Sequence, residues 1–291
     1  MTMTANTLRL STAPEVDGFD RMLGASSRRY LGGGHTRVSI YVTGVIRLDE
    51  DTFGGSATVI YPEDWSVKEG QQRTPHLSTV DAIRIADITH GKLRETHLPW
   101  LSCYAASSLE VRAGAKPCEV LEELAVASRL EGTSRDDTVI VRHKIGTLLV
   151  SVTWTRQSNV LSREVVSADH DGADVHAVQL EGADTATCRI HRRATGSAEM
   201  SFVEALTLTA QLAQVVLYGG DAAVRERSRN MWMRRARFER IATSEATAQT
   251  VVVQLHNQRE LSVGGDTIRT VDVLAEDVCG IKVTASLAMP A

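Results

Sequence analysis

The chain has 291 residues, of which 43% are hydrophobic, enough for one large domain or two ordinary ones with a true core. Its 32 Lys+Arg against 36 Asp+Glu give a net charge of -4, which lacks the positive excess used to bind nucleic-acid phosphates and so disfavours a nucleic-acid partner. The 4 cysteines form no Cys-x-x-Cys pair, and no apolar run reaches the roughly 18 residues of a membrane span, so we expect a cytoplasmic protein without a zinc site or membrane segment.

The first half of the chain combines strand patterns with one helix. Residues 1–27 are predicted to form a polar N-terminal arm. Residues 37–46 alternate β-branched and polar side chains, which is the period of a half-buried strand. The three glycines at 32–34 precede this strand and not a helix, so we interpret them as a bend and not as a phosphate-binding loop. Further strands are predicted at 57–61, 108–112, 124–130, 138–143 and 147–156.

A mostly buried helix is predicted to begin at Ser78. Ser78 and Asp81 match the capping-box pattern, in which an acid three residues after a serine closes the first helical turn. Apolar residues between 77 and 88 leave little of the helix surface polar, and Gly91 is predicted to end it.

Residues 158–187 are rich in acidic and small side chains, a composition that is typical of a solvated connector. Acids and histidines gather there, but the glycine at 172 and the missing closing glutamate break the EF-hand pattern, so we predict no metal site. The cluster consists of Asp169, His170, Asp171, Asp174 and His176.

The second half, 188–291, contains the longest apolar helix, predicted at 201–218 and ended by two glycines. A helix that is hydrophobic all round is central to a fold, so its polar residues Glu204 and Gln211 need partners or serve a site. Strands are predicted on both sides of this helix, at 175–180, 187–193, 250–256, 267–274 and 281–289.

The two helix starts resemble each other and indicate an internal duplication. Ser78 and Ser201 both begin the pattern Ser-x-Val-acid-Ala-aliphatic, and strands follow each helix. We therefore predict two half-domains, 28–157 and 188–291, related by a pseudo-twofold axis. The two helix N-termini would then line one shared cleft and offer N–H groups and partial positive charge to a ligand carbonyl or oxyanion.

Three residues at these helix starts are candidates for acid–base catalysis. His76 precedes the first cap and has a pKa near neutral pH, which suits a general base, and Glu204 or Asp81 would orient it or exchange protons with a substrate. The alternative is that both acids only cap their helices and that His76 is a surface residue.

An arginine-rich segment, 225–240, has two interpretations. Its side chains alternate in character, so it is either an edge strand with charges paired by Glu226 and Glu239, or a substrate site. In the second case Arg234 or Arg235 holds the phosphate of a sugar phosphate or of a pantetheine arm, because a guanidinium group fits phosphate oxygens. Arginines on the outer face would alternatively dock an acidic carrier protein.

Four segments together resemble the avirulence protein D (AvrD) family of syringolide-type synthases, and more distantly the A-factor synthases. They are 29–38 (RYLGGGHTRV), 75–82 (PHLSTVDA), 214–221 (QVVLYGGD) and 230–235 (NMWMRR). The resemblance implies an enzyme that joins a β-ketoacyl thioester to a small sugar and closes a butenolide-type lactone. It also implies a hotdog fold, in which a long helix lies in a curled antiparallel sheet.

We therefore expect an α+β double hotdog, with two antiparallel sheets each wrapped around a central helix. The expected activity is transfer of a β-ketoacyl group from coenzyme A or an acyl carrier protein to a small sugar or polyol, without metal or redox cofactor, in a monomer or homodimer. The alternatives are a dehydratase or thioesterase of the same fold, or a non-catalytic acyl-binding module. The predicted substrate-binding residues are Arg234, Arg235, Trp232, Gln211 and His35.

Overall fold

The computed structural model describes residues 18–65, 67–68, 71–114, 116–157, 174–191, 199–228, 231–241, 248–263 and 266–290. Most of the predicted N-terminal arm lies outside these residues, as do Asp169, His170 and Asp171 of the predicted connector.

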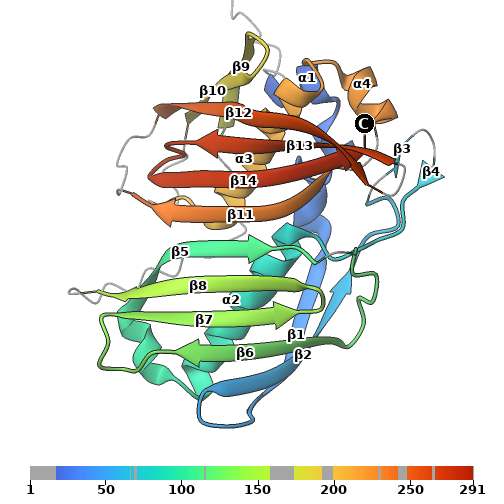
Figure 1. The fold of residues 1–291 in the computed structure, drawn as a ribbon. Coiled ribbons are helices and arrows are strands. Elements are labelled where there is room, and N and C mark those ends of the chain that lie inside the picture. Colours follow the sequence, from blue (N-terminus) through green and yellow to red (C-terminus); the bar gives the residue numbers. More distant parts are fainter. Residues whose placement is uncertain are drawn as a thin grey trace, which may run out of the picture.

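One antiparallel sheet of 12 strands runs through the molecule (Figure 1). Its first six strands along the chain are β1 (Ser39–Arg47), β2 (Thr52–Ile60), β5 (Tyr104–Arg112), β6 (Leu124–Glu131), β7 (Thr138–Ile145) and β8 (Leu148–Arg156). The other six are β9 (Asp174–Glu181), β10 (Thr185–His191), β11 (Trp232–Arg240), β12 (Ala248–Val263), β13 (Asp266–Ala275) and β14 (Ile281–Pro290). A separate two-stranded ribbon consists of β3 (Val67–Lys68) and β4 (Gln71–Gln72).

The helices are fewer and lie beside the sheet. The two long ones are α2 (Thr79–Thr96) and α3 (Phe202–Leu217), and the two short ones are α1 (Gly18–Leu23) and α4 (Ala222–Arg227). Three single turns of 3-10 helix are η1 (Ser26–Arg28), η2 (Gly34–Arg37) and η3 (Pro99–Cys103). The predicted bend at the three glycines leads into η2, directly before β1.

The order of elements repeats between the two halves. Each half has two strands, one long helix and then four strands. From the outer edge to the centre of the sheet the order is β1-β2-β6-β7-β8-β5 in one half and β9-β10-β12-β13-β14-β11 in the other, so every strand has a topological counterpart. This repetition matches the duplication that the two serine-headed helices indicated.

The two predicted sheets are in fact one, because β5 pairs with β11. Leu109 of β5 lies opposite Phe238 of β11, and both side chains are buried. The prediction that the arginine-rich segment forms an edge strand is wrong for the same reason, since β11 lies between β5 and β14. Pairing the two central strands satisfies backbone groups that separate sheets would leave unpaired.

Each long helix packs on the inner face of its own half. α2 contacts β1, β7 and β8, α3 contacts β10, β12 and β14, and the two helices contact each other. α3 ends at glycines 219 and 220, which both have positive φ, as predicted. α2 continues through Gly91 to Thr96, so the predicted end is wrong; the buried Leu93 anchors its last turns instead.

Candidate active site

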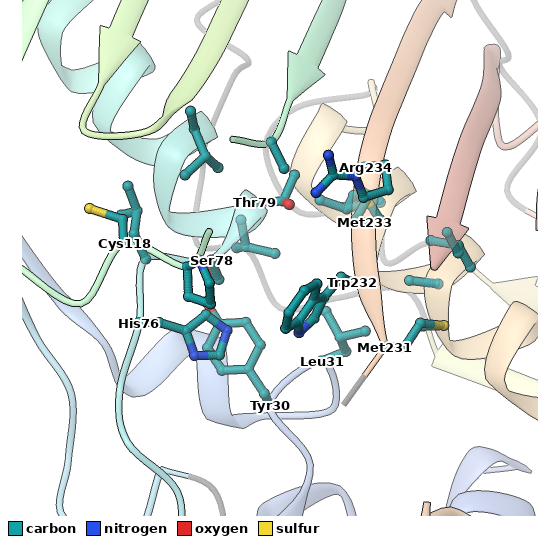
Figure 2. Close-up of a pocket in the computed structure, with 18 of the residues that line it drawn as sticks. Tyr30, Leu31, His76, Ser78, Thr79, Cys118, Met231, Trp232, Met233 and Arg234 are labelled. Atoms are coloured by element: carbon teal, nitrogen blue, oxygen red, sulfur yellow. The ribbon is translucent and has the colours of Figure 1, made fainter. Parts of the chain in front are cut away.

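A cavity of about 240 Å³ lies between the two halves of the protein. Its walls come from the loop before β1, the start of α2, the loop after β5, one side of α3, α4 and the first residues of β11. Figure 2 shows His76, Ser78 and Tyr30 on one side of this cavity and Trp232, Met233 and Arg234 on the other. Elements far apart in the sequence therefore build one site.

The start of α2 forms the polar end of the cavity. Ser78 Oγ accepts a hydrogen bond from the Asp81 backbone N–H over 3.0 Å, and the Asp81 carboxylate accepts one from the Ser78 N–H over 3.3 Å, so the predicted capping box is confirmed. Thr79 and Val80 are the first two residues of the helix, and their N–H groups have no acceptor within it. Because both residues line the cavity, the helix start offers N–H donors and partial positive charge to a ligand oxygen.

Beneath the helix start, the buried Asp81 carboxylate gathers several hydroxyl groups. Its Oδ2 accepts hydrogen bonds from Ser78 Oγ over 2.6 Å, from the Tyr30 hydroxyl over 2.8 Å and from the Tyr61 hydroxyl. The Tyr30 and Ser78 hydroxyl oxygens are 2.5 Å apart. Burial, and then the charge of Asp81, raise the pKa of both tyrosines, so both remain protonated donors.

His76 lies next to this network at the cavity wall. Its ring packs edge-on against Trp65, with 5.8 Å between ring centroids, and its Nδ1 lies 3.5 Å from the Thr74 carbonyl oxygen. The Tyr61 hydroxyl donates to the His76 carbonyl oxygen over 2.8 Å and so ties the backbone of His76 to the Asp81 network. Within the described parts of the chain the imidazole has no carboxylate partner, so the predicted pairing with Asp81 or Glu204 is not present.

The first residues of β11 form the opposite wall. Trp232 is 44% exposed, and Arg234 Nη1 donates to the Gly114 carbonyl oxygen over 3.0 Å, which joins β11 to the loop after β5. Both residues line the cavity, as the predicted substrate-binding role requires.

Among the described residues, every side chain with a permanent charge that lines the cavity is a cation: Arg29, Lys116, Arg225 and Arg234. Arg29 is 2% exposed and pairs with Asp20 over 2.7 Å. Burial, and then the nearby charge of Arg29, lower the pKa of Arg225. An anionic ligand would relieve the repulsion between these groups, so the electrostatics of the cavity favour a negatively charged or strongly polarised substrate.

A family of known proteins matches this chain. The model of the Pseudomonas avirulence D protein (AvrD) family covers residues 15–174 and 157–290, nearly the whole sequence. The chain belongs to the AvrD family. The resemblance seen in the four sequence segments is thereby confirmed. A search of curated proteins found no match to this AvrD-family chain.

Solved structures of similar shape have little sequence in common with the AvrD-family chain. An acyl-CoA thioesterase II from Mycobacterium marinum is 12% identical with a TM-score of 0.41, and the match covers 85% of this chain and 94% of that one. A conserved protein with a hot dog fold from Alicyclobacillus acidocaldarius is 12% identical with a TM-score of 0.44, covering 89% and 97%. Because these TM-scores are below 0.5, the likenesses do not by themselves define fold or activity.

In the AvrD-family structure, Glu204 does not join the cavity. Its carboxylate accepts a hydrogen bond from the Ser201 N–H over 2.7 Å and its own N–H donates to Ser201 Oγ, a second capping box. From α3 the cavity takes Leu206 and residues further along the helix, and neither Ser201 nor Glu204. The prediction that both helix starts converge on one pocket is therefore wrong: only α2 begins at this cavity.

Three predicted substrate-binding residues are also placed elsewhere. Arg235 points to the outer face of the sheet, because it alternates with the buried Ala236 and Phe238, and its Nη2 pairs with Glu110 over 2.8 Å there. Gln211 is buried and accepts a hydrogen bond from Arg29. His35 contacts the Tyr30 carbonyl oxygen through Nδ1 over 3.1 Å.

Several residues of the site were not predicted. Tyr30 belongs to the first segment that resembles the AvrD family, Tyr61 ends the strand predicted at 57–61, and Trp65 lies in the loop after that strand; only the segment that contains Tyr30 gives a signal in the sequence. Within the described residues no three His, Cys, Asp or Glu side chains are grouped to hold a metal ion, and none of the helices is long and apolar enough to span a membrane.

Proposed function

We propose that this AvrD-family protein is a double-hotdog enzyme that transfers a β-ketoacyl group from a thioester to a hydroxyl of a small sugar or polyol and promotes closure to a butenolide-type lactone. The repeat of two strands, a long helix and four strands supports the architecture. The observation that carries the activity is the meeting of the α2 start, the Tyr30, Ser78 and Asp81 network and His76 at one cavity with cationic walls.

In the first step, the thioester carbonyl oxygen lies at the N–H groups of Thr79 and Val80. His76 removes the proton of the acceptor hydroxyl as its oxygen attacks the carbonyl carbon. The helix start stabilises the tetrahedral oxyanion. The C–S bond then breaks, and the leaving thiolate takes the proton from the His76 imidazolium, so that the ester and a free thiol are the products.

In the second step, the same imidazole removes a proton from the acidic carbon between the two carbonyls of the ester. The carbanion attacks the ketone of the sugar and closes a five-membered lactone, and the alkoxide formed from the ketone takes the proton back from the His76 imidazolium. Loss of one water molecule from the resulting alcohol gives the butenolide double bond. A single histidine beside a helix N-terminus serves both steps, because each step transfers one proton and builds one oxyanion.

The remaining residues bind the substrate or position other side chains of the site. Asp81 contacts neither the cavity nor His76; it holds the hydroxyls of Ser78, Tyr30 and Tyr61, so we assign it a positioning role. Arg234 would bind the anionic or polar end of a substrate, and the ring of Trp232 would cover the bound substrate. We assign Glu204, Arg235, Gln211 and His35 no substrate contact.

The test is product analysis after incubation of the protein with a 3-oxoacyl thioester, with and without a pentulose or a polyol. Acceptor-dependent thiol release and an ester or lactone of matching mass are expected. Thiol release at the same rate without acceptor, with only free acid formed, would identify a thioesterase. Loss of water from a 3-hydroxyacyl thioester would identify a dehydratase. Ligand binding with no turnover of either thioester would make the protein an acyl-binding module.

A further inference from the structure

The outer face of the sheet beside the cavity has an ordered distribution of charge. On β5, β7 and β8 the residues that alternate with the buried ones point away from the helices. Because strand register is known, these outward residues can be grouped in rows that run across β11, β5, β8 and β7. Each row lies at a defined distance along the strands from the cavity.

The row nearest to the cavity is basic. It contains, in order, Arg235, Arg112, Leu149 and Lys144. The side chains of Arg112 and Arg235 are 58% and 50% exposed. This row adjoins the cavity directly, because Arg112 is followed by the lining residues Ala113 and Gly114 and Arg235 is preceded by Arg234.

Along these four strands, the next row has a lower positive charge, and the row after it has a negative charge. The second row contains Arg237, Glu110, Ser151 and Arg142, in which Glu110 bonds to both Arg112 and Arg235 of the first row. The third row contains Glu239, Ser108, Thr153 and Ile140, and has no cation. Positive charge therefore increases toward the cavity, although the chain as a whole has a net charge of -4.

This surface is an open sheet face and not a pocket. Neighbouring strands are about 4.8 Å apart, so the basic row spans on the order of 14 Å from β11 to β7. A nucleotide is bound in concave sites that cover most of its surface, whereas a flat row of exposed cations suits the surface of an acidic protein. The exposed glutamates 119, 122 and 123, in the loop that leads to β6, would repel such a partner and keep it over the basic row from β11 to β7.

We propose that the acyl chain reaches the cavity on an acidic carrier protein, which docks on the basic row of Arg235, Arg112 and Lys144. Its phosphopantetheine arm passes Lys116 and Arg234 at the cavity wall and presents the thioester to the start of α2. The identity of the substrate carrier rests on the proposed function, but the docking surface rests on the register and exposure of these cations alone.

The experiment compares one 3-oxoacyl chain on an acidic acyl carrier protein and on coenzyme A. Lys144→Glu and Arg235→Glu should each lower kcat/KM for the carrier-bound chain on the order of fivefold, with no change for the coenzyme A thioester. Arg259→Glu on β12 has the same charge change on an exposed residue of the other half and should leave both values unchanged. Added salt should reduce only the carrier-dependent rate.

A second measurement is independent of catalysis. The carrier protein with its phosphopantetheine arm but no acyl chain is titrated against the full chain and the three variants. Binding that Lys144→Glu and Arg235→Glu weaken, and Arg259→Glu does not, supports the docking surface even if no thioester is turned over. Absent binding, equal effects of all three variants, or preference for coenzyme A overturns the proposal. Failure of both thioesters to react, with normal carrier binding, would reject the proposed function only.

Discussion

The hydroxyl of Tyr30 donates a hydrogen bond to Oδ2 of Asp81 over 2.8 Å, although the two residues are 51 positions apart. This bond joins the loop before β1 to the first turn of α2 and fixes the floor of the cavity. Asp81 is fully buried, and its Oδ1 has no partner among the described residues, so the hydroxyls at Oδ2 balance the cost of its burial.

The first prediction concerns this network. Tyr61→Phe removes a hydroxyl that donates to both Asp81 and the His76 carbonyl oxygen, so the free energy of unfolding should fall by about 1–3 kcal/mol. Tyr41→Phe is the control, because Tyr41 is 57% exposed. Urea unfolding of both variants measures the difference. Equal stability of the two variants would show that the network does not support the buried carboxylate.

The second prediction uses the two capping serines. Ser78→Ala and Ser201→Ala each remove an N-cap, so each should lower the free energy of unfolding by about 1 kcal/mol. Only Ser78 lines the cavity, so only Ser78→Ala should also lower the turnover of a 3-oxoacyl thioester in the presence of a polyol. Loss of turnover in Ser201→Ala at equal stability would place a working site at the start of α3.

How far the sequence predicts this site depends on whether its signals are local. Both capping boxes lie within four residues, and the structure contains both, as predicted. The strand periods are also local and placed the strands of both halves. The pairing of β5 with β11 is not local, and it made the arginine-rich segment central.

The side-chain directions in β11 also depend on a feature that local sequence signals do not predict. Residues 231–234 all line the cavity, whereas further along only the alternate residues Ala236 and Phe238 are buried, because the bulge after Met233 interrupts the regular alternation. Sequence alternation places Arg234 on the face of Ala236 and Phe238 and Arg235 on the opposite face, but it does not predict that Met231 and Met233 also reach the cavity. It also does not predict the role of Tyr61, whose hydroxyl meets Asp81 of α2 only in the folded chain.

The third prediction follows from the opposite directions of Arg234 and Arg235. Arg234→Gln should raise KM for an anionic or thioester substrate by roughly tenfold, because a charged hydrogen-bond partner contributes about 1.5 kcal/mol or more. Arg235→Gln should leave KM for a small thioester unchanged, since Arg235 pairs with Glu110 outside the cavity. Steady-state kinetics with a coenzyme A thioester distinguish the two. A larger effect at Arg235 would contradict the placement of β11.

The fourth prediction concerns pH and two buried histidines in the core of the first half. Burial lowers the pKa of His143 from 6.5 to about 4, and burial, then the charge of His143, lower the pKa of His90. Below pH 6.5 the unfolded chain binds protons at these histidines that the folded chain does not bind. The contribution of the two histidines to the free energy of unfolding is therefore fully present above pH 6.5 and is lost as the pH falls. For His143 the loss extends to about pH 4 and amounts to on the order of 3 kcal/mol.

Urea unfolding between pH 8 and pH 5 measures this slope. His143→Gln should make stability less dependent on pH, because one of the two titrations is removed. A pH dependence that His143→Gln leaves intact would mean that His143 is not the group that titrates.

The central claim is that acyl transfer takes place at the start of α2, with His76 as the base. The most direct measurement is the acceptor-dependent rate of thiol release from a 3-oxoacyl thioester by the wild type, His76→Gln and Glu204→Gln. His76→Gln should lower this rate by about 10²–10⁴-fold, while Glu204→Gln, changed at a cap outside the cavity, should stay within about twofold of the wild type. Full activity in His76→Gln, or its loss in Glu204→Gln alone, would contradict the account.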